Sequence, residues 1–390
     1  VSLASWDGRS TLLGGTLGGD FPAFYNDGRI IADDSSKLYD LGNQLRLYRE
    51  LLPGEPANVF LPYANPPLLA AAMVPLAMLP YTLAYVLFTL ISIVLYTAGV
   101  ALVLRACPRL SRDARRTALL VAVAFEPFVI ETLHGGQLSA LAVLLVGLAI
   151  WLQGRGRAVL AGVVVAGLLY KPTLLVLVGP MLLLGGHWRV LLGFVVGAAV
   201  LAGGSILLVG TDTCMNYLRL LGMYAHSAGD DAVFRTFKFV DINSFGRMLG
   251  TGWLAAVAVV PAVLLVIHFS LTGWRTAWAA ALLWTPVLNV YVGVYDLCIL
   301  VPGMLLWIDS RQSTDRRLLP AAAGSLFVVA WFSQHVAIWS GVQLLTLVLL
   351  GVGAAHWWRS RNDQGVESGD LDKAGSVVPA GSSELPVIWV

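Results

Sequence analysis

The chain alternates apolar blocks with short polar loops, after a long polar start. Residues 1–65 are polar and predict only short helical pieces, and residues 66–78 predict a short interfacial helix broken by Pro75 and Pro80. The apolar blocks that follow, each predicting a hydrophobic helix, are 81–104, 117–133, 138–152, 158–170, 172–186, 190–209, 253–271, 276–291, 297–308, 318–335 and 341–357. The tail 359–390 is rich in Gly, Ser and acids, which predicts disorder.

The composition assigns this pattern to a membrane protein. Hydrophobic residues make up 57% of the chain and charged residues 12%, whereas soluble domains carry about 25% charge. We therefore predict an all-α polytopic membrane protein with about ten hydrophobic helices, some short or broken. The predicted domains are an outer segment 1–65, a transmembrane domain 66–358 and a disordered cytoplasmic tail 359–390. The sequence contains no nucleic-acid, Walker, GxGxxG or HExxH motif, so we expect no nucleic acid, cofactor or metal.

The arginines give the orientation in the membrane. The loop 105–116 holds five of them, and the other basic loops are 153–157, 187–189, 273–275, 309–317 and 357–361. By the positive-inside rule these loops are cytoplasmic. The segments that then face outward are 1–65, 134–137, 210–250, 289–296 and 333–341. This orientation suits the plasma membrane of the cell, and it predicts a further apolar helix of ~20 residues before Val1.

A charged break interrupts the block 158–186. Both flanks are basic, and each arm has about 13 residues, or ~20 Å, which is short of a ~30 Å membrane core. The arms meet at Lys171-Pro172, where the proline interrupts the helical hydrogen bonds. Lys171 should therefore line a cavity or meet an anion, unless it snorkels between helices.

The apolar pair 276–291 and 297–308 is also predicted to form a bent hairpin, because both of its flanks are basic and both of its arms are short. Its tip, NVYVGVYD, carries Tyr291, Tyr295 and Asp296. An acid beside tyrosines at the outer end of a helix pair suits sugar hydroxyls. Asp296 equally suits a helix N-terminus, where a carboxylate is favoured.

Six motifs in order resemble glycosyltransferase family 87, the polyprenol-phosphate-sugar-dependent transferases of the GT-C superfamily. They are GGDFPAFY, LPYANPPLLAAAMVPLAMLP, EPFVIETLHGGQLSALAVLL, LLYKPTLLVLVGP, DINSFGRMLG and YDLCILVP, which together span about residues 18–310. The resemblance implies a GT-C-type helical bundle in the bilayer. It also implies an inverting transfer of a sugar, with mannose as the first expectation, from a polyprenyl phosphate to a hydroxyl of a lipid-linked or glycan acceptor at the extracytoplasmic face. Some mannosyltransferases of the family carry a His pair where this chain has Tyr295-Asp296, which leaves the acceptor open.

This chemistry needs one carboxylate to take the hydroxyl proton and one cation for the phosphate leaving group. The matched motif assigns Asp20 as the base, although an acid beside Pro22 also suits a helix start. Lys171 is the leading cation, with Arg235 and Lys238 in reserve. Glu126 and Glu131 either line the substrate cavity or bond between helices. The other candidates for binding donor or acceptor are Tyr63, His134, Gln137, Asn243, Tyr295 and Asp296.

A non-enzymatic lipid or solute transporter is the alternative function. Transporters share broken helices but commonly show internal repeats, and no clear repeat is present here. The two classes also predict different placements of the polar groups. An enzyme should gather Asp20, Lys171 and Asp296 at the outer face, whereas a transporter should place them along a path across the midplane.

Overall fold

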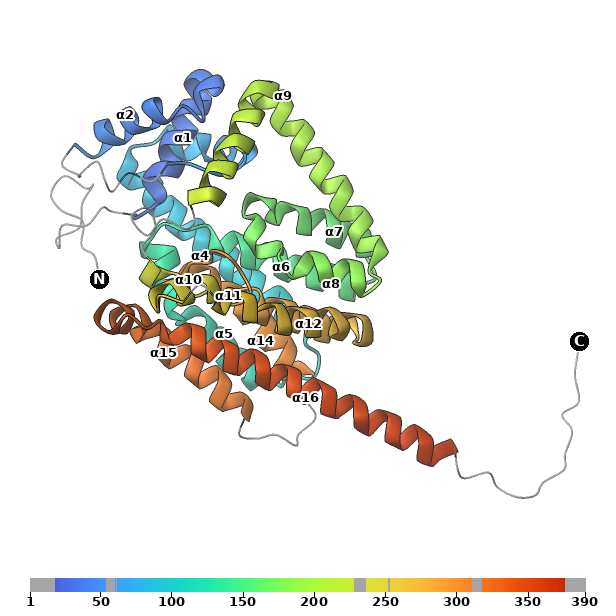
Figure 1. The fold of residues 1–390 in the computed structure, drawn as a ribbon. Helices are drawn as coiled ribbons and strands as arrows, with labels where there is room; N and C mark the ends of the chain where they lie inside the picture. The colour runs from blue at the N-terminus through green and yellow to red at the C-terminus, as the bar shows by residue number, and fades with distance from the viewer. Residues whose placement is uncertain are drawn as a thin grey trace, which may run out of the picture.

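Helices form all the extended regular structure in the described residues, which are 18–53, 60, 62–227, 236–251, 253–310 and 318–375 of a computed structural model. The α-helices are α1 (Phe21–Asp34), α2 (Leu41–Leu51), α3 (Pro67–Ala77), α4 (Tyr81–Ala106), α5 (Arg112–Val123), α6 (Ser139–Gly154), α7 (Ala158–Ala166), α8 (Val178–Leu184), α9 (Trp188–Ser227), α10 (Ile242–Met248), α11 (Leu254–Val257), α12 (Val259–Leu271), α13 (Trp274–Trp284), α14 (Leu300–Asp309), α15 (Leu318–Ser340) and α16 (Leu344–Gly375). The short 3-10 or π-helical turns are η1 (Ser35–Lys37), η3 (Pro127–His134), η4 (Gly167–Tyr170), η5 (Pro172–Leu175), η6 (Thr236–Lys238) and η7 (Val294–Ile299). Figure 1 shows them as one bundle with α1 and α2 at one end.

Three described helices are long and apolar enough to cross a membrane alone: Tyr81–Ala106, Trp188–Met223 and Leu318–Ser340. A fourth span is possible by length and composition if α5 and η3, which meet at a bend of 45°, count as one. The other apolar helices are 10–17 residues long, and they include the pieces on either side of Lys171. The prediction of an all-α membrane protein with short and broken helices is therefore confirmed.

The helices α4 and α6 pack with their backbones in contact. A Cβ added to Gly99 would lie 2.6 Å from the carbonyl oxygen of Val143, and one added to Gly147 would lie 2.3 Å from that of Gly99. Small residues permit such close approach between helices in lipid, where apolar side chains gain nothing by leaving water. This pair fixes α4 against the helix that follows the loop 134–138.

Aromatic side chains attach the N-terminal segment to the start of α4. The ring of Phe21 lies 5.7 Å from the rings of both Tyr81 and Tyr85 and 4.8 Å from that of Phe88. The hydroxyl of Tyr25 donates to the carbonyl of Leu79 at 2.7 Å. The residues just before α1 are therefore held at the N-terminal end of a membrane-spanning helix.

The two charged breaks form as predicted, and they touch. The chain leaves helical geometry at Lys171, with φ −140° and ψ 83°, between η4 and η5. The helices α13 and α14 pack together, and the side chain of Asn289 in the tip between them donates to the carbonyl of Thr173 at 2.8 Å. The same tip also pairs with the strand-like segment before α10, because the Val240 amide donates to the Val292 carbonyl at 3.0 Å.

Three expectations differ from the structure. Pro75 lies inside α3 near its end, where it removes one backbone hydrogen bond without ending the helix. Part of the expected outer loop 210–250 is helical, because α9 resumes after Gly210 (φ 79°) and continues to Ser227; Figure 1 shows its second half turning back toward α1. The tail expected to be disordered from 359 is helical as far as Gly375, since an established helix extends at little cost.

Parts of four predicted segments lie outside the described residues. They are 1–17, 54–59 and 61 of the outer segment, 228–235 of the loop before α10, 311–317 of the basic loop 309–317, and 376–390 of the tail.

Candidate active site

Asp20 lies where two glycine-containing loops meet. Its backbone amide donates to the carbonyl of Gly135 at 3.0 Å, and its carboxylate accepts a hydrogen bond from the Gln137 side chain. Gly136 has a φ of +66°, and a Cβ there would lie 2.0 Å from the carbonyl oxygen of Gly18. Only glycine fits this approach, so the loop 135–137 fixes both the backbone and the side chain of Asp20.

The carboxylate of Asp20 does not cap α1. Asp20 is the N-cap residue and Pro22 stands in the first turn, but the Asp20 side chain makes no capping hydrogen bond. A structural N-cap aspartate would accept from a backbone amide of the first turn. Asp40 does so at the start of α2, accepting from Gly42 and Asn43 at 2.9 and 3.1 Å. The Asp20 carboxylate, which is partly buried, is instead directed toward Gln137.

Lys171 forms an ion pair with the tip of the α13–α14 hairpin. Its Nζ lies 2.7 Å from Oδ2 of Asp296 and 4.2 Å from the centre of the Tyr295 ring. Asp296 is 2% exposed, and the same Oδ2 accepts from the Gly293 amide at 3.3 Å. The helix-start interpretation of Asp296 is therefore confirmed, because its carboxylate accepts from the backbone at the start of η7, and the same carboxylate also pairs with Lys171. Its contact with sugar hydroxyls stays a prediction.

Lys238 is the second lysine that affects Asp20, and its ion pair is longer than that of Lys171. Lys238 in η6 has its Nζ 3.8 Å from Oε2 of Glu131, and 37% of its side chain is exposed. Glu131 is also held through Oε1, which accepts from Gln334 at 2.6 Å. Sequence reasoning named Lys238 only as a reserve cation, because nothing local to its loop indicates that α15 and η3 lie beside it. Arg235, the other reserve, lies outside the described residues.

The surroundings shift the pKa of Asp20 in both directions. Burial of the carboxyl group is the largest effect and raises the pKa. The charge of Lys238, the hydrogen bond from Gln137 and the charge of Lys171 lower the pKa, in that order, and the charge of Glu131 raises it. The net result is a pKa above the usual value of an aspartate. Both lysines are thus within electrostatic reach of Asp20.

Two of the remaining candidates lie beside the Asp20 loop or the hairpin tip, and one lies elsewhere. His134 is exposed at the end of η3, next to Gly135, whose carbonyl accepts from the Asp20 amide. The side chain of Asn243 donates to the Val290 carbonyl in the hairpin tip at 3.1 Å. Tyr63 lies elsewhere: it is 2% exposed, its hydroxyl donates to the Pro66 carbonyl at 3.0 Å, and its ring packs edge-on against Phe24. These contacts give Tyr63 a packing role, so its proposed sugar contact is not supported by its position.

This arrangement supplies the groups needed for transfer of a group from phosphate to a hydroxyl. A carboxylate with a raised pKa is a stronger base than an exposed one. Two ammonium groups nearby can stabilise negative charge that develops on a leaving phosphate. In the described part of the chain, no three His, Cys, Asp or Glu side chains are grouped so as to hold a metal ion.

Comparison with known protein families gives a match over most of the chain. The sequence model of glycosyltransferase family 87 matches residues 63–308. The matched range includes Gln137, Lys171, Lys238 and Asp296, whereas Asp20 precedes it. No curated protein and no solved structure matches the chain.

Proposed function

Since this chain belongs to glycosyltransferase family 87 and carries membrane-spanning helices, we propose that it transfers a sugar, mannose in the first instance, from a polyprenyl-phosphate donor. The acceptor is a hydroxyl of a lipid-linked molecule or glycan, and the active site faces the extracytoplasmic side of the plasma membrane. Asp20 is the general base. The observation that carries this proposal is the Asp20 carboxylate, which is free of capping, fixed by Gln137 and close to two lysines.

In the proposed reaction, the acceptor hydroxyl oxygen attacks C1 of the donor sugar while Asp20 takes the hydroxyl proton. The bond between C1 and the phosphate oxygen breaks, and the electron pair leaves with the polyprenyl phosphate. Attack on the face opposite the phosphate inverts the configuration at C1. A positioned base contributes typically ~10²–10⁴-fold to such a step.

Lys238 is the better candidate to meet the leaving phosphate directly. Lys171 already has a buried carboxylate 2.7 Å away, so an incoming phosphate would have to compete with Asp296. Lys238 is more exposed, and its carboxylate partner is 3.8 Å away. We therefore assign Lys238 to the phosphate and Lys171 to holding the tip with Tyr295 and Asp296 beside Asp20.

The position of the polar groups favours an enzyme over a transporter. Asp20 is anchored beside the first turns of α4, and the lysines that affect its pKa gather at the same end of the bundle. A transporter would distribute such groups along a path near the bilayer midplane. The arginine-rich loop 105–116 follows the other end of α4, which supports an outward-facing active site.

The test is an assay of the purified full-length protein in detergent or nanodiscs. Radiolabelled polyprenyl-phosphate mannose is offered with a panel of lipid and glycan acceptors, and polyprenyl-phosphate glucose and arabinose serve as matched donors. We expect label to move from the donor to an acceptor in the wild-type protein and not in Asp20→Asn. Transfer from one of the other donors in place of mannose would overturn the sugar assignment. Uptake of the intact donor into vesicles without any transfer would favour the transporter.

A further inference from the structure

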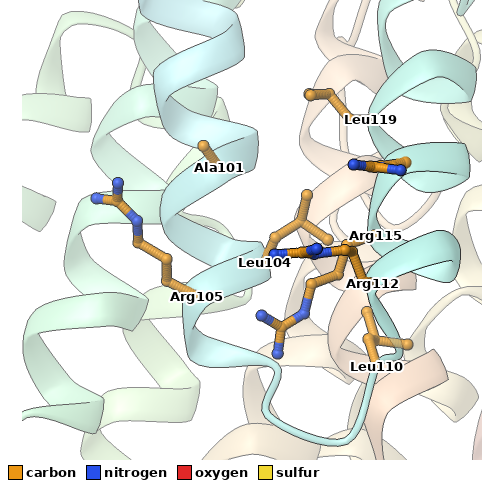
Figure 2. Close-up of a pocket in the computed structure, with 8 residues that line it drawn as sticks. Ala101, Leu104, Arg105, Leu110, Arg112, Arg115 and Leu119 are labelled. Carbon is orange, nitrogen blue, oxygen red and sulfur yellow. The ribbon is translucent and has the colours of Figure 1, made fainter.

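A basic groove lies between the end of α4 and the start of α5 (Figure 2). Its volume is about 450 Å³. Four arginines line it together with four apolar side chains, and these residues are Arg105, Arg112, Arg115, Arg116, Ala101, Leu104, Leu110 and Leu119. Charge and apolar surface thus occur side by side in one concave site.

The positive charge of this groove has no carboxylate partner among the described residues. The side chains of Arg105, Arg112 and Arg116 make no hydrogen bond or ion pair with those residues, while Arg115 donates to the Cys107 carbonyl at 2.8 Å. The Nε of Arg115 is buried and without a partner in the described structure.

Two acids lie near the groove, Asp113 and Asp309. Asp113, in the first turn of α5, is exposed and forms no ion pair with the described residues, so the four arginines outnumber this one carboxylate. Asp309 accepts from the Arg109 amide at 2.8 Å and pairs with Arg275 at 3.0 Å. It is therefore not available to neutralise the arginines of the groove, and these arginines remain suited to an external anion.

The groove is remote from Asp20. Tyr85, in the first turns of α4, donates to the Leu133 carbonyl beside the Asp20 site, whereas Arg105 lies in the last turn of the helix. A helix of 26 residues is about 39 Å long, which exceeds the ~30 Å hydrocarbon core. The groove and Asp20 therefore lie at opposite membrane faces, so the groove cannot hold the reacting end of a donor.

We propose that this groove binds the phosphate headgroup of an anionic phospholipid in the leaflet opposite the Asp20 site. Guanidinium groups bind phosphate oxygens through paired N–H donors, and basic pockets between membrane helices suit anionic headgroups. Leu104, Leu110 and Leu119 would lie along the first part of the acyl chains.

The apolar surroundings favour a lipid over free phosphate. Leu120 and Val121, in the same turn of α5 as the groove residue Leu119, are 71% and 45% exposed. Such exposure is expected of a helix surface in contact with acyl chains. A free phosphate would use the arginines but gain nothing from the leucines.

The test uses native mass spectrometry of the full chain purified in a zwitterionic detergent. Phosphatidylglycerol is titrated against phosphatidylcholine with the same acyl chains, and inorganic phosphate is added in a third arm. The groove variant is Arg112→Gln with Arg116→Gln, because both side chains are exposed and make no contact in the described structure whose loss would unfold the protein. The control is Arg155→Gln with Arg157→Gln, which removes the same charge from another exposed basic loop.

We expect the wild-type protein to prefer phosphatidylglycerol, and the groove variant to lose about 30-fold in its affinity, or about fivefold for each arginine. The control variant should retain wild-type affinity, and both variants should melt at the wild-type temperature without added lipid. The proposal would be overturned if the groove variant bound phosphatidylglycerol as tightly as the wild type, or if the control lost as much affinity as the groove variant. Either result would mean that the groove arginines act only as general cytoplasmic positive charge. Competition by inorganic phosphate as effective as that by the lipid would overturn the assignment to a lipid.

Discussion

Asp20→Asn separates the catalytic role of this carboxylate from any structural one. Asparagine keeps the size of the side chain and an oxygen that can accept from Gln137, and the bond from the residue 20 amide to Gly135 is unaffected. The substitution therefore removes the proton acceptor while leaving the loop contact in place. We expect the turnover rate to fall by ~10²–10⁴-fold, which corresponds to about 3–5 kcal/mol in activation free energy.

The stability of the folded Asp20→Asn variant should be equal to or higher than that of the wild type. Burial raises the pKa of Asp20, so the folded protein binds this proton more tightly than the unfolded chain does. The ionised carboxylate then costs stability as the pH rises from the unfolded value, about 3.9, through the raised pKa. An uncharged asparagine has no such cost, so the melting temperature of Asp20→Asn at neutral pH should equal or exceed that of the wild type.

The assay pairs initial rates at saturating donor with donor affinity and melting temperature on the same preparation. Loss of rate with donor affinity and melting temperature preserved is the expected result. A rate near the wild-type value would refute Asp20 as the base and make Asp296 the next carboxylate to test. A parallel loss of rate and stability would show that Asp20 is structural, contrary to the missing cap bond.

Four further predictions concern the surroundings of Asp20. The rate should decline as the pH falls through the raised pKa of Asp20, so its acidic limb should lie above the ordinary aspartate value of about 3.9, as a pH–rate profile can show. Lys171→Met should lower the free energy of unfolding by about 3–5 kcal/mol, because it leaves the buried Asp296 unpaired, and adding Asp296→Asn should recover much of this loss in a thermal melt. Lys238→Met should weaken donor binding by about 10–100-fold, measured by titration, at nearly unchanged stability. Gly136→Ala should reduce turnover by about 10²-fold through displacement of the Asp20 loop.

Two of these predictions have a matched control variant. Gly179→Ala adds the same methyl group at a glycine with nothing within 4 Å of the new Cβ, and it should leave turnover unchanged. Lys37→Met removes an exposed lysine from a surface pair with Asp34 and should not affect donor binding. A double variant of Lys171 and Asp296 that is no more stable than Lys171→Met would contradict the buried ion pair.

The sequence predicted those features of the site that depend on local chemistry. The proline after Lys171 predicted the break, and the short arms predicted the hairpin that carries Tyr295 and Asp296. The assignment of Asp20 as the base stays a prediction. Partners that come from distant segments were not predictable in the same way. The contact of Lys238 with Glu131 depends on how η6 packs beside η3, and no periodicity within either segment encodes that placement.

Two helix ends were misjudged because the sequence signals there are ambiguous. The apolar block 190–209 was expected to end in an outer loop, yet Gly210 at positive φ permits a turn after which the helix resumes. Polar residues after 358 predicted disorder, but α16 continues because its apolar part has already formed the nucleus. In both cases, whether the helix continues depends on the helical segment that precedes the expected end.

The Lys171–Asp296 ion pair has a consequence for biosynthesis. The two residues are 125 positions apart (296 minus 171), and translation adds about 5–20 residues per second, so the lysine leaves the ribosome about 6–25 s before its partner. During that interval the nascent chain presents α7 and α8 to the bilayer with an unneutralised ammonium group between them. An unpaired charge is costly to hold within the bilayer. We therefore expect the break to reach its final depth only after the second hairpin has been made, so that membrane integration takes at least two stages.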